Sequence, residues 1–178
     1  MTRGLYKLKM ESEKWKMNQE YYNRLYAKAK KAIGDHTPLK ADCGQLCGGA
    51  CCKGDENTGM LLFPFEETTL ERKSAGKRTL AVCNGHCSRD ERPLSCMIFP
   101  FFPCIDETGK ITVRPDLRGM PVCPMLSHRE EISFDTVFLR RVARVGRILS
   151  RDKESRQMLE EISKEIDDYE KMQKLFGK

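Results

Sequence analysis

This sequence lacks the long hydrophobic runs of a membrane protein. Its longest apolar stretch, residues 97–105, is interrupted by prolines and is much shorter than the ~20 residues of a transmembrane helix, so we expect a soluble protein with no membrane partner. The first residues also lack the apolar segment of a signal peptide, and we therefore expect a cytoplasmic location. Thiols stay reduced in the cytoplasm, which argues against a disulfide framework.

Several enzyme signatures are missing as well. No two cysteines have the Cys-x-x-Cys spacing of a thioredoxin-like redox site, and no glycine-rich loop of the nucleotide-binding type follows a predicted strand. The three histidines, His36, His86 and His128, stand far apart, and no serine–histidine–acid arrangement is suggested. Whether the chain is an enzyme stays open at this point.

Cysteine is what the sequence has in excess. There are nine, an odd number that cannot close entirely into internal pairs, and four of them fall in the run 43–52 between small or glycine residues. The pair Gly48-Gly49 argues against a helix continuous through Cys51 and predicts a turn there. Thiolate is a soft ligand for zinc, copper(I) or iron–sulfur clusters, so we interpret the clusters as metal ligands rather than as disulfides, a redox pair or inert buried thiols. Eight thiolates can form two four-cysteine sites, or four of them can form one site with the rest spare. An extended Cys51-Cys52 pair would point its side chains to opposite sides, toward two sites or toward two faces of one larger cluster.

Other residues near the cysteines are expected to support a metal. Four thiolates around one zinc carry a net charge of about −2, so Arg89, Arg92 or Arg118 is expected to donate to sulfur. The phenylalanines of 97–103 are expected to form an apolar shell around the metal. His86 is either a ligand or a loop residue.

The rest of the chain predicts an α+β fold in a single domain, residues 1–178. Apolar residues at three- and four-residue steps predict an N-terminal helix over 18–34. Runs at 60–65 and 79–82, and residues 110–114 after a turn, predict strands, while 66–72 predicts a helical turn with Glu66 and Glu67 near its N-terminus. A capping-box pattern at Ser127 predicts the start of two C-terminal helices over 127–177, broken near Ser150. We expect a small, metal-stapled, loop-rich core with short strands, flanked by the N-terminal helix and a C-terminal helical hairpin.

One face of the first C-terminal helix is basic. It carries Arg140, Arg144, Arg147 and Arg151, a pattern that would suit a nucleic acid or an acidic protein. The second helix carries abundant acid, however, so we favour a solvated face and do not expect a nucleic-acid partner. The net charge of +6 permits an anionic partner without requiring one.

The cysteine order resembles that of the YkgJ-like cysteine-cluster family, described as zinc- or iron-chelating proteins with a CxxCxxCC motif. The similar parts are the run ending Cys51-Cys52, the Cys83 and Cys87 region, the stretch RPLSCMIFP at 92–100, which is similar to the family's RPxxCRxFP box, and Cys123. The first spacings here are x3 and x3 rather than x2 and x2, and methionine stands at 97 where arginine is usual.

The resemblance covers residues 43–124 and implies a cysteine-cluster metal-binding core there. With the ninth thiol, Cys104, left as a spare, the implied metal ligands are Cys43, Cys47, Cys51, Cys52, Cys83, Cys87, Cys96 and Cys123. Zinc is the expected cofactor, with an iron–sulfur cluster as the alternative.

The leading functional prediction is a metal-binding protein with one or two cysteine-ligated zinc or iron centres. A protein partner is left open. A second prediction is an iron–sulfur enzyme or accessory acting on a protein substrate, since some members of the resembled family are called flagellin lysine methylases. A third is an adaptor that meets an acidic partner or nucleic acid through the arginine face.

Overall fold

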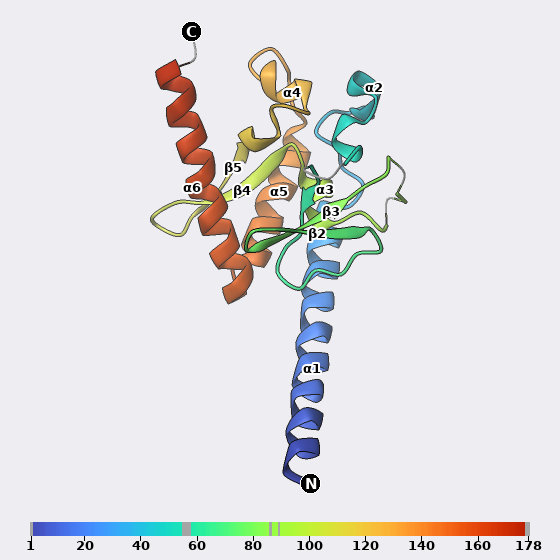
Figure 1. The fold of residues 1–178 in the computed structure, drawn as a ribbon. Coiled ribbons are helices and arrows are strands. Elements are labelled where there is room, and N and C mark those ends of the chain that lie inside the picture. Colours follow the sequence, from blue (N-terminus) through green and yellow to red (C-terminus); the bar gives the residue numbers. More distant parts are fainter. Residues whose placement is uncertain (1, 55–57, 86, 89, 177–178) are drawn as a thin grey trace.

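The computed structural model describes residues 2–54, 58–85, 87–88 and 90–176, and it confirms an α+β fold (Figure 1). None of the helices in this described part is long and apolar enough to cross a membrane. In chain order the elements are α1 (Thr2–Ile33), α2 (Gly44–Cys47), the 3₁₀ turn η1 (Ala50–Cys52), β1 (Met60–Leu61), β2 (Glu71–Ala75), β3 (Arg78–Val82), α3 (Leu94–Ile98), β4 (Phe101–Ile105), β5 (Ile111–Pro115), the 3₁₀ turn η2 (Leu117–Gly119), α4 (Pro124–Ser127), α5 (Thr136–Leu149) and α6 (Lys153–Phe176).

The antiparallel ribbon of β4 and β5 is the centre of the main hydrophobic core. Every residue of β4 is buried, and alternate side chains face opposite sides as the pleat of a strand requires. Phe101 packs edge-on against Phe138 of α5, whereas Phe102 on the other face stacks on Phe63. On the α6 side, the backbone N–H of Ile105 donates to Ser163 Oγ at 2.8 Å. Helices α5 and α6 therefore cover the ribbon, which explains why a strand inside the cysteine-rich segment is wholly apolar.

Gly146 lets α5 lie directly on β4. A Cβ at this position would stand 2.5 Å from Cβ of Pro103 and 2.8 Å from Cγ2 of Ile111, closer than real side chains approach. The predicted turn at 106–109 joins β4 to β5, with Asp106 accepting from the backbone N–H groups of Thr108 and Lys110.

Helix α1 is longer than the sequence pattern predicted. It begins at Thr2 rather than near residue 18, and its N-terminal half projects away from the rest of the molecule (Figure 1). The C-terminal half packs against α5 through the fully buried Ala29 and Ile33. The amphipathic pattern marked the part of the helix that packs, because only that part needs an apolar face.

The segment 66–72 does not form the predicted helical turn. Residues Glu71–Ala75 are strand β2, which pairs with β3 in an antiparallel sheet of order β1-β3-β2. Glu66 does stand at a helix N-terminus, but at that of the distant α3: its carboxylate accepts from the backbone N–H of Leu94 at 2.7 Å and of Phe63 at 3.2 Å.

The C-terminal helices are interrupted near Ser150, as predicted, but the capping box at Ser127 was wrong. Pro124 starts the short α4, and α5 begins only after Asp135, whose carboxylate accepts from the N–H of Val137 at 2.8 Å. Proline already has the backbone angle of a first helical residue, so the helix starts before the predicted serine cap. Asp152 caps α6 in the same way through Ser155 at 2.8 Å.

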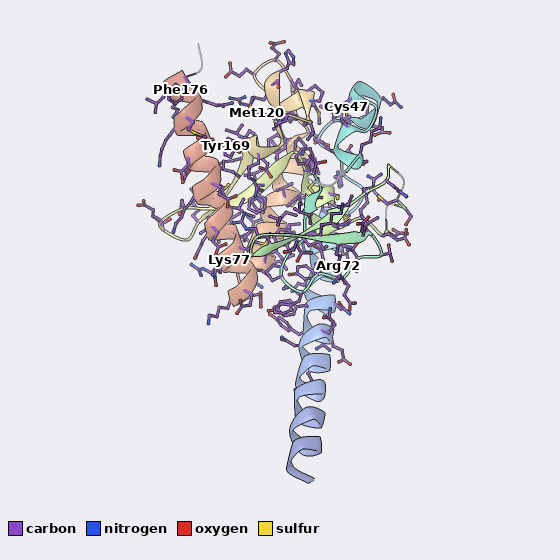
Figure 2. The ribbon with its side chains drawn as sticks, viewed as in Figure 1. Cys47, Arg72, Lys77, Met120, Tyr169 and Phe176 are labelled. Carbon is purple, nitrogen blue, oxygen red and sulfur yellow. The ribbon has the colours of Figure 1, made fainter. Side chains whose placement is uncertain are left out.

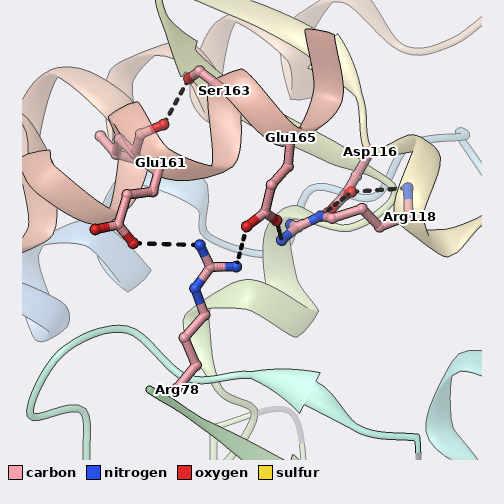
Figure 3. A network of polar contacts seen from close by, with 7 residues as sticks. Arg78, Asp116, Arg118, Glu161, Ser163 and Glu165 are labelled. Carbon is pink, nitrogen blue, oxygen red and sulfur yellow. Dashed lines mark hydrogen bonds and ion pairs between the residues drawn. The ribbon is translucent and has the colours of Figure 1, made fainter. Parts of the chain in front are cut away.

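Ion pairs attach α6 to the rest of the fold. Glu165 lies between Arg78, at 2.7 Å, and Arg118, at 3.2 Å, and Arg118 also pairs with Asp116 (Figure 3). Arg114 of β5 pairs with Asp167 and with Glu170, the latter at 2.8 Å. The acidic side of α6 is thus used within the fold.

Candidate metal centre

One cavity of about 760 Å³ collects the cysteine-rich segments. It lies outside the β4–β5 core, on the side of the molecule that carries α2, where Figure 2 labels Cys47. Its wall includes all eight cysteines that the sequence predicted: Cys43, Cys47, Cys51, Cys52, Cys83, Cys87, Cys96 and Cys123. The tertiary structure thus brings together thiols separated by up to 80 positions of sequence, 43 to 123.

The first four of these cysteines lie on a tightly turning loop. Helix α2 ends at Gly48 and the next residue is Gly49, both with positive φ, 60° and 69°, which side chains with a Cβ rarely adopt. The chain therefore turns between Cys47 and Cys51, as the glycine pair predicted. Behind this turn, Gly54 donates its N–H to the carbonyl of Cys83 at 2.8 Å, which fixes the loop beside the end of β3.

Cys51 and Cys52 do not point to opposite sides. Both lie in the 3₁₀ turn η1 rather than in extended backbone, and their sulfurs are 4.0 Å apart. The prediction that these two thiols point to opposite sides was therefore wrong, because successive side chains alternate only in extended strands. The two thiols stay adjacent at the middle of the cysteine series.

Short helices position Cys96 and Cys123, the last two of the eight cysteines that line the cavity. Cys96 lies on α3, whose first N–H is held by the buried Glu66, and it is half-hidden from solvent. Cys123 immediately precedes α4 and is buried with Met125 and Leu126 in a small apolar cluster.

Burial and charge separate the thiols into two electrostatic types. Desolvation raises the pKa of Cys43, Cys96 and Cys123, so these groups are protonated in the metal-free protein at neutral pH. The pKa of Cys52 is lowered to about 6, first by the hydrogen bond from the Cys51 thiol and then by the charge of Arg92.

Arg92 lies where a cation is needed to balance thiolates. Its guanidinium lies near the thiols of Cys87, Cys52 and Cys96, and its buried Nε has no hydrogen-bond partner among the described residues. Of the other two arginines expected there, Arg118 is instead paired with Asp116 and Glu165 and lies over the ring of Phe102. Arg89 lies outside the described residues.

Cys104 is separate from the cavity. It is 1% exposed on β4, and burial raises its pKa to about 11. This position agrees with the prediction that Cys104 is the thiol left out of the metal ligands. The expected apolar shell of phenylalanines is wrong in part, because Phe101 and Phe102 belong to the main core and Phe99 is the one that lines the cavity. His86 lies outside the described residues.

Other soft and polar groups in the wall of the cysteine cavity were not predicted from the sequence. Met60, Met97 and Met125 line the cavity together with His36 and Asp42. Thioether sulfur is also a soft ligand, so these methionines extend the sulfur-rich character of the site. No spacing rule indicates them, because each comes from a different element.

The thiols do not yet converge on a point. In the part of the chain that the structure describes, no group of three or more Cys, His, Asp or Glu side chains is arranged to hold a metal ion. The donor set itself fits zinc or an iron–sulfur cluster, since it is almost entirely thiolate. Binding would require side-chain rotation and some closure of the glycine-containing loop.

No protein-family model matches the chain, and no curated protein or solved structure matches it. The resemblance to the YkgJ-like family stays a prediction, based on the order of the cysteines.

Proposed function

We propose that this is a metal-binding protein whose cysteine cavity holds two four-thiolate centres, with zinc as the metal. The observation that carries the proposal is that all eight predicted cysteines line one cavity while the ninth is buried elsewhere. Cysteines that served only as apolar filler would have no reason to face a common solvent-accessible space. The proposed membership of the YkgJ-like family agrees with this function.

The neighbours of each thiol support two centres rather than one. Cys43, Cys47 and Cys123 influence one another electrostatically, and so do Cys83, Cys87 and Cys96. The adjacent pair lies between these groups: Cys51 is influenced by Cys43 and Cys47, whereas Cys52 influences Cys96. Cys51 would complete the first set of four and Cys52 the second.

Zinc is the proposed metal because eight thiolates suffice for two closed four-cysteine sites, the usual arrangement of structural zinc. The sulfurs of Cys51 and Cys52, 4.0 Å apart, would each serve a different centre. Arg92, next to Cys87 and Cys52, would offset part of the negative charge of the second centre.

The proposed role of the metals is structural. The cysteine region has only a small apolar cluster, with Cys123, Met125 and Leu126 as its buried members. Closed four-cysteine zinc sites stabilise such small folds by on the order of 10 kcal/mol. The metals would hold α2, η1 and α4 to α3, which Leu94 and Ile98 anchor in the main core.

Metal content of protein purified without oxygen tests the proposal. We expect about two zinc ions per chain by elemental analysis, and about one in Cys96→Ser, which removes a ligand of the second centre only. Cys43→Ser should likewise leave about one, and combining the two changes should leave none. The matched control is Cys104→Ser, which should keep both ions.

Other outcomes would contradict the proposal in different ways. A metal-free, fully folded protein or cross-linked thiols in the cell would overturn metal binding itself. A brown protein with absorbance near ~400 nm that dithionite bleaches would replace zinc by an iron–sulfur cluster and favour the enzyme or accessory function. Loss of all metal from Cys96→Ser and from Cys43→Ser alike would indicate a single shared centre.

A further inference from the structure

A second concave surface lies between α1 and α5, remote from the cysteines. This basic groove has a volume of about 530 Å³, and its wall contains Lys28 and Lys31 from α1 with Arg144, Arg147 and Arg151 from α5 and the turn after it. Ala32 and Ile148 are the apolar residues that line it. Five cations from two segments more than 100 positions apart in the sequence thus face one space.

Close packing of the two helices fixes the shape of the groove. Ala29 and Ile33 of α1 are fully buried, as are Val145 and Leu149 of α5, and the small alanine side chains allow a close approach. Arg141 then donates from Nη1 to the carbonyl of Ala32 at 3.0 Å, which ties the end of α1 to α5. The cations are therefore presented on a rigid pair of helices rather than on loops.

The acids of α6 do not neutralise this groove. Glu161 and Glu165 pair with Arg78 of β3, and Asp167 and Glu170 pair with Arg114 of β5, and neither arginine lines the groove. Across the described residues, none of the ion pairs involves the five groove cations.

Asp152 comes next to Arg151 in the chain, but its carboxylate is already engaged. It is buried, accepts from the backbone N–H of Ser155 at 2.8 Å, and lies near Tyr21 and Tyr22 of α1. Most of the acidic residues that argued against a nucleic-acid partner in the sequence are therefore engaged outside the basic groove.

We propose that the basic groove binds the phosphate backbone of a nucleic acid. Arginine forks and lysine ammonium groups are the usual phosphate contacts, and their grouping on one face is the electrostatic pattern of such a surface. An acidic protein partner fits less well, because protein interfaces are centred on buried aromatic or large apolar anchors and this groove offers only Ala32 and Ile148. The described wall of the groove has no Asn, Gln or aromatic side chain, so we expect its cations to contact phosphates, with little sequence preference.

Fluorescence anisotropy with labelled single-stranded RNA, single-stranded DNA and duplex DNA of mixed sequence tests this proposal. The full chain should bind at least one of them at 50 mM salt, with affinity that falls steeply by 200 mM because bound cations are released from the phosphates. The variant R144Q/R147Q/R151Q should bind at least tenfold more weakly at 50 mM salt and should show a shallower salt dependence, by about two units in the log–log slope.

A charge-matched control separates the groove from net charge. The variant K77Q/K110Q/K164Q removes three exposed lysines outside the groove, so it should lose less than threefold in affinity. Equal weakening of both variants, or no binding of any probe by the wild-type protein at 50 mM salt, would overturn the proposal. Tighter binding to poly-glutamate or to anionic vesicles than to every nucleic acid would also overturn it, in favour of an acidic protein or a membrane surface. Unchanged metal content in R144Q/R147Q/R151Q shows that the groove and the cysteine cavity are being tested separately.

Discussion

The two halves of this protein are held together by different means. In the half formed by α1, α5, α6 and the β4–β5 ribbon, large apolar side chains such as Phe138, Leu159 and Ile162 are completely buried. Around the cysteine cavity, a separate small cluster has Cys123, Met125 and Leu126 as its buried members among the described residues, and α3 is anchored in the main core by Leu94 and Ile98. The first half has a conventional hydrophobic core, whereas the second consists of short helices, turns and eight thiols around a cavity.

In the second half, therefore, thiols lie where the first half has large buried apolar side chains. A region of turns and four- or five-residue helices cannot offset the entropy of its ordered backbone through so little apolar burial. Proposed metal centres would supply that missing stability, and removing them should affect one half far more than the other. The predictions below change one half at a time.

Removal of metal should have the largest effect and should be confined to the cysteine region. Treatment with a strong chelator should remove on the order of 10 kcal/mol of stabilisation from this half. Hydrogen exchange followed by mass spectrometry should show lost protection in segments 37–54 and 119–127, while α5 and α6 keep theirs. Equal loss of protection in both halves would mean that the two are one cooperative unit.

The chelator effect should also depend on pH in one direction. Burial raises the pKa of Cys43, Cys96 and Cys123, and these thiols must lose protons to bind metal. Metal affinity should therefore fall as pH is lowered, because protons then compete more strongly for sulfur. Affinity that does not change between pH 8 and pH 6 would argue against thiolate ligation.

Truncation of the main core should come next in magnitude. Phe138→Ala removes a ring that is 0% exposed and contacts Phe101, so it should lower the free energy of unfolding by about 3–5 kcal/mol in a urea titration. The metal content of the folded fraction should stay unchanged. Phe176→Ala, at a ring 82% exposed, is the matched control and should cost less than about 0.5 kcal/mol.

The contact between the halves should give the smallest effect. Glu66 accepts from two backbone N–H groups, of Phe63 and Leu94, and an amide can offer only one oxygen to them. Glu66→Gln should therefore cost about 1–3 kcal/mol. Because Leu94 begins the helix that carries Cys96, metal should also be released at lower chelator concentration.

Glu67→Gln provides the control, since Glu67 is exposed and accepts only from Asn23 at 3.2 Å across the surface. It should change neither stability beyond about 0.5 kcal/mol nor metal release. If Glu66→Gln weakened metal binding no more than Glu67→Gln, the carboxylate would be a structural cap of the main core alone.

Local patterns anticipated much of the secondary structure. The helical periodicity of residues 18–33 and 134–149, the turn at 106–109, the strand before Cys83 and the glycine turn between Cys47 and Cys51 all agree with the structure. Each of these depends on neighbours within a few positions. The errors at Ser127 and at 66–72 arose where two local signals competed, proline against a serine cap and a polar run against strand pairing.

Local sequence was enough to predict the α+β class and to show the number and order of the thiols, because composition, spacing and short-range periodicity are properties of the chain. The fold was needed to show that eight thiols face one cavity, that Glu66 caps a helix 28 positions away, and that lysines of α1 join arginines of α5. These are contacts between distant segments, and their formation depends on how the whole chain buries its apolar surface. Side-chain direction at Cys51 and Cys52 likewise followed from the turn in which they lie, since backbone dihedral angles determine where a thiol can point.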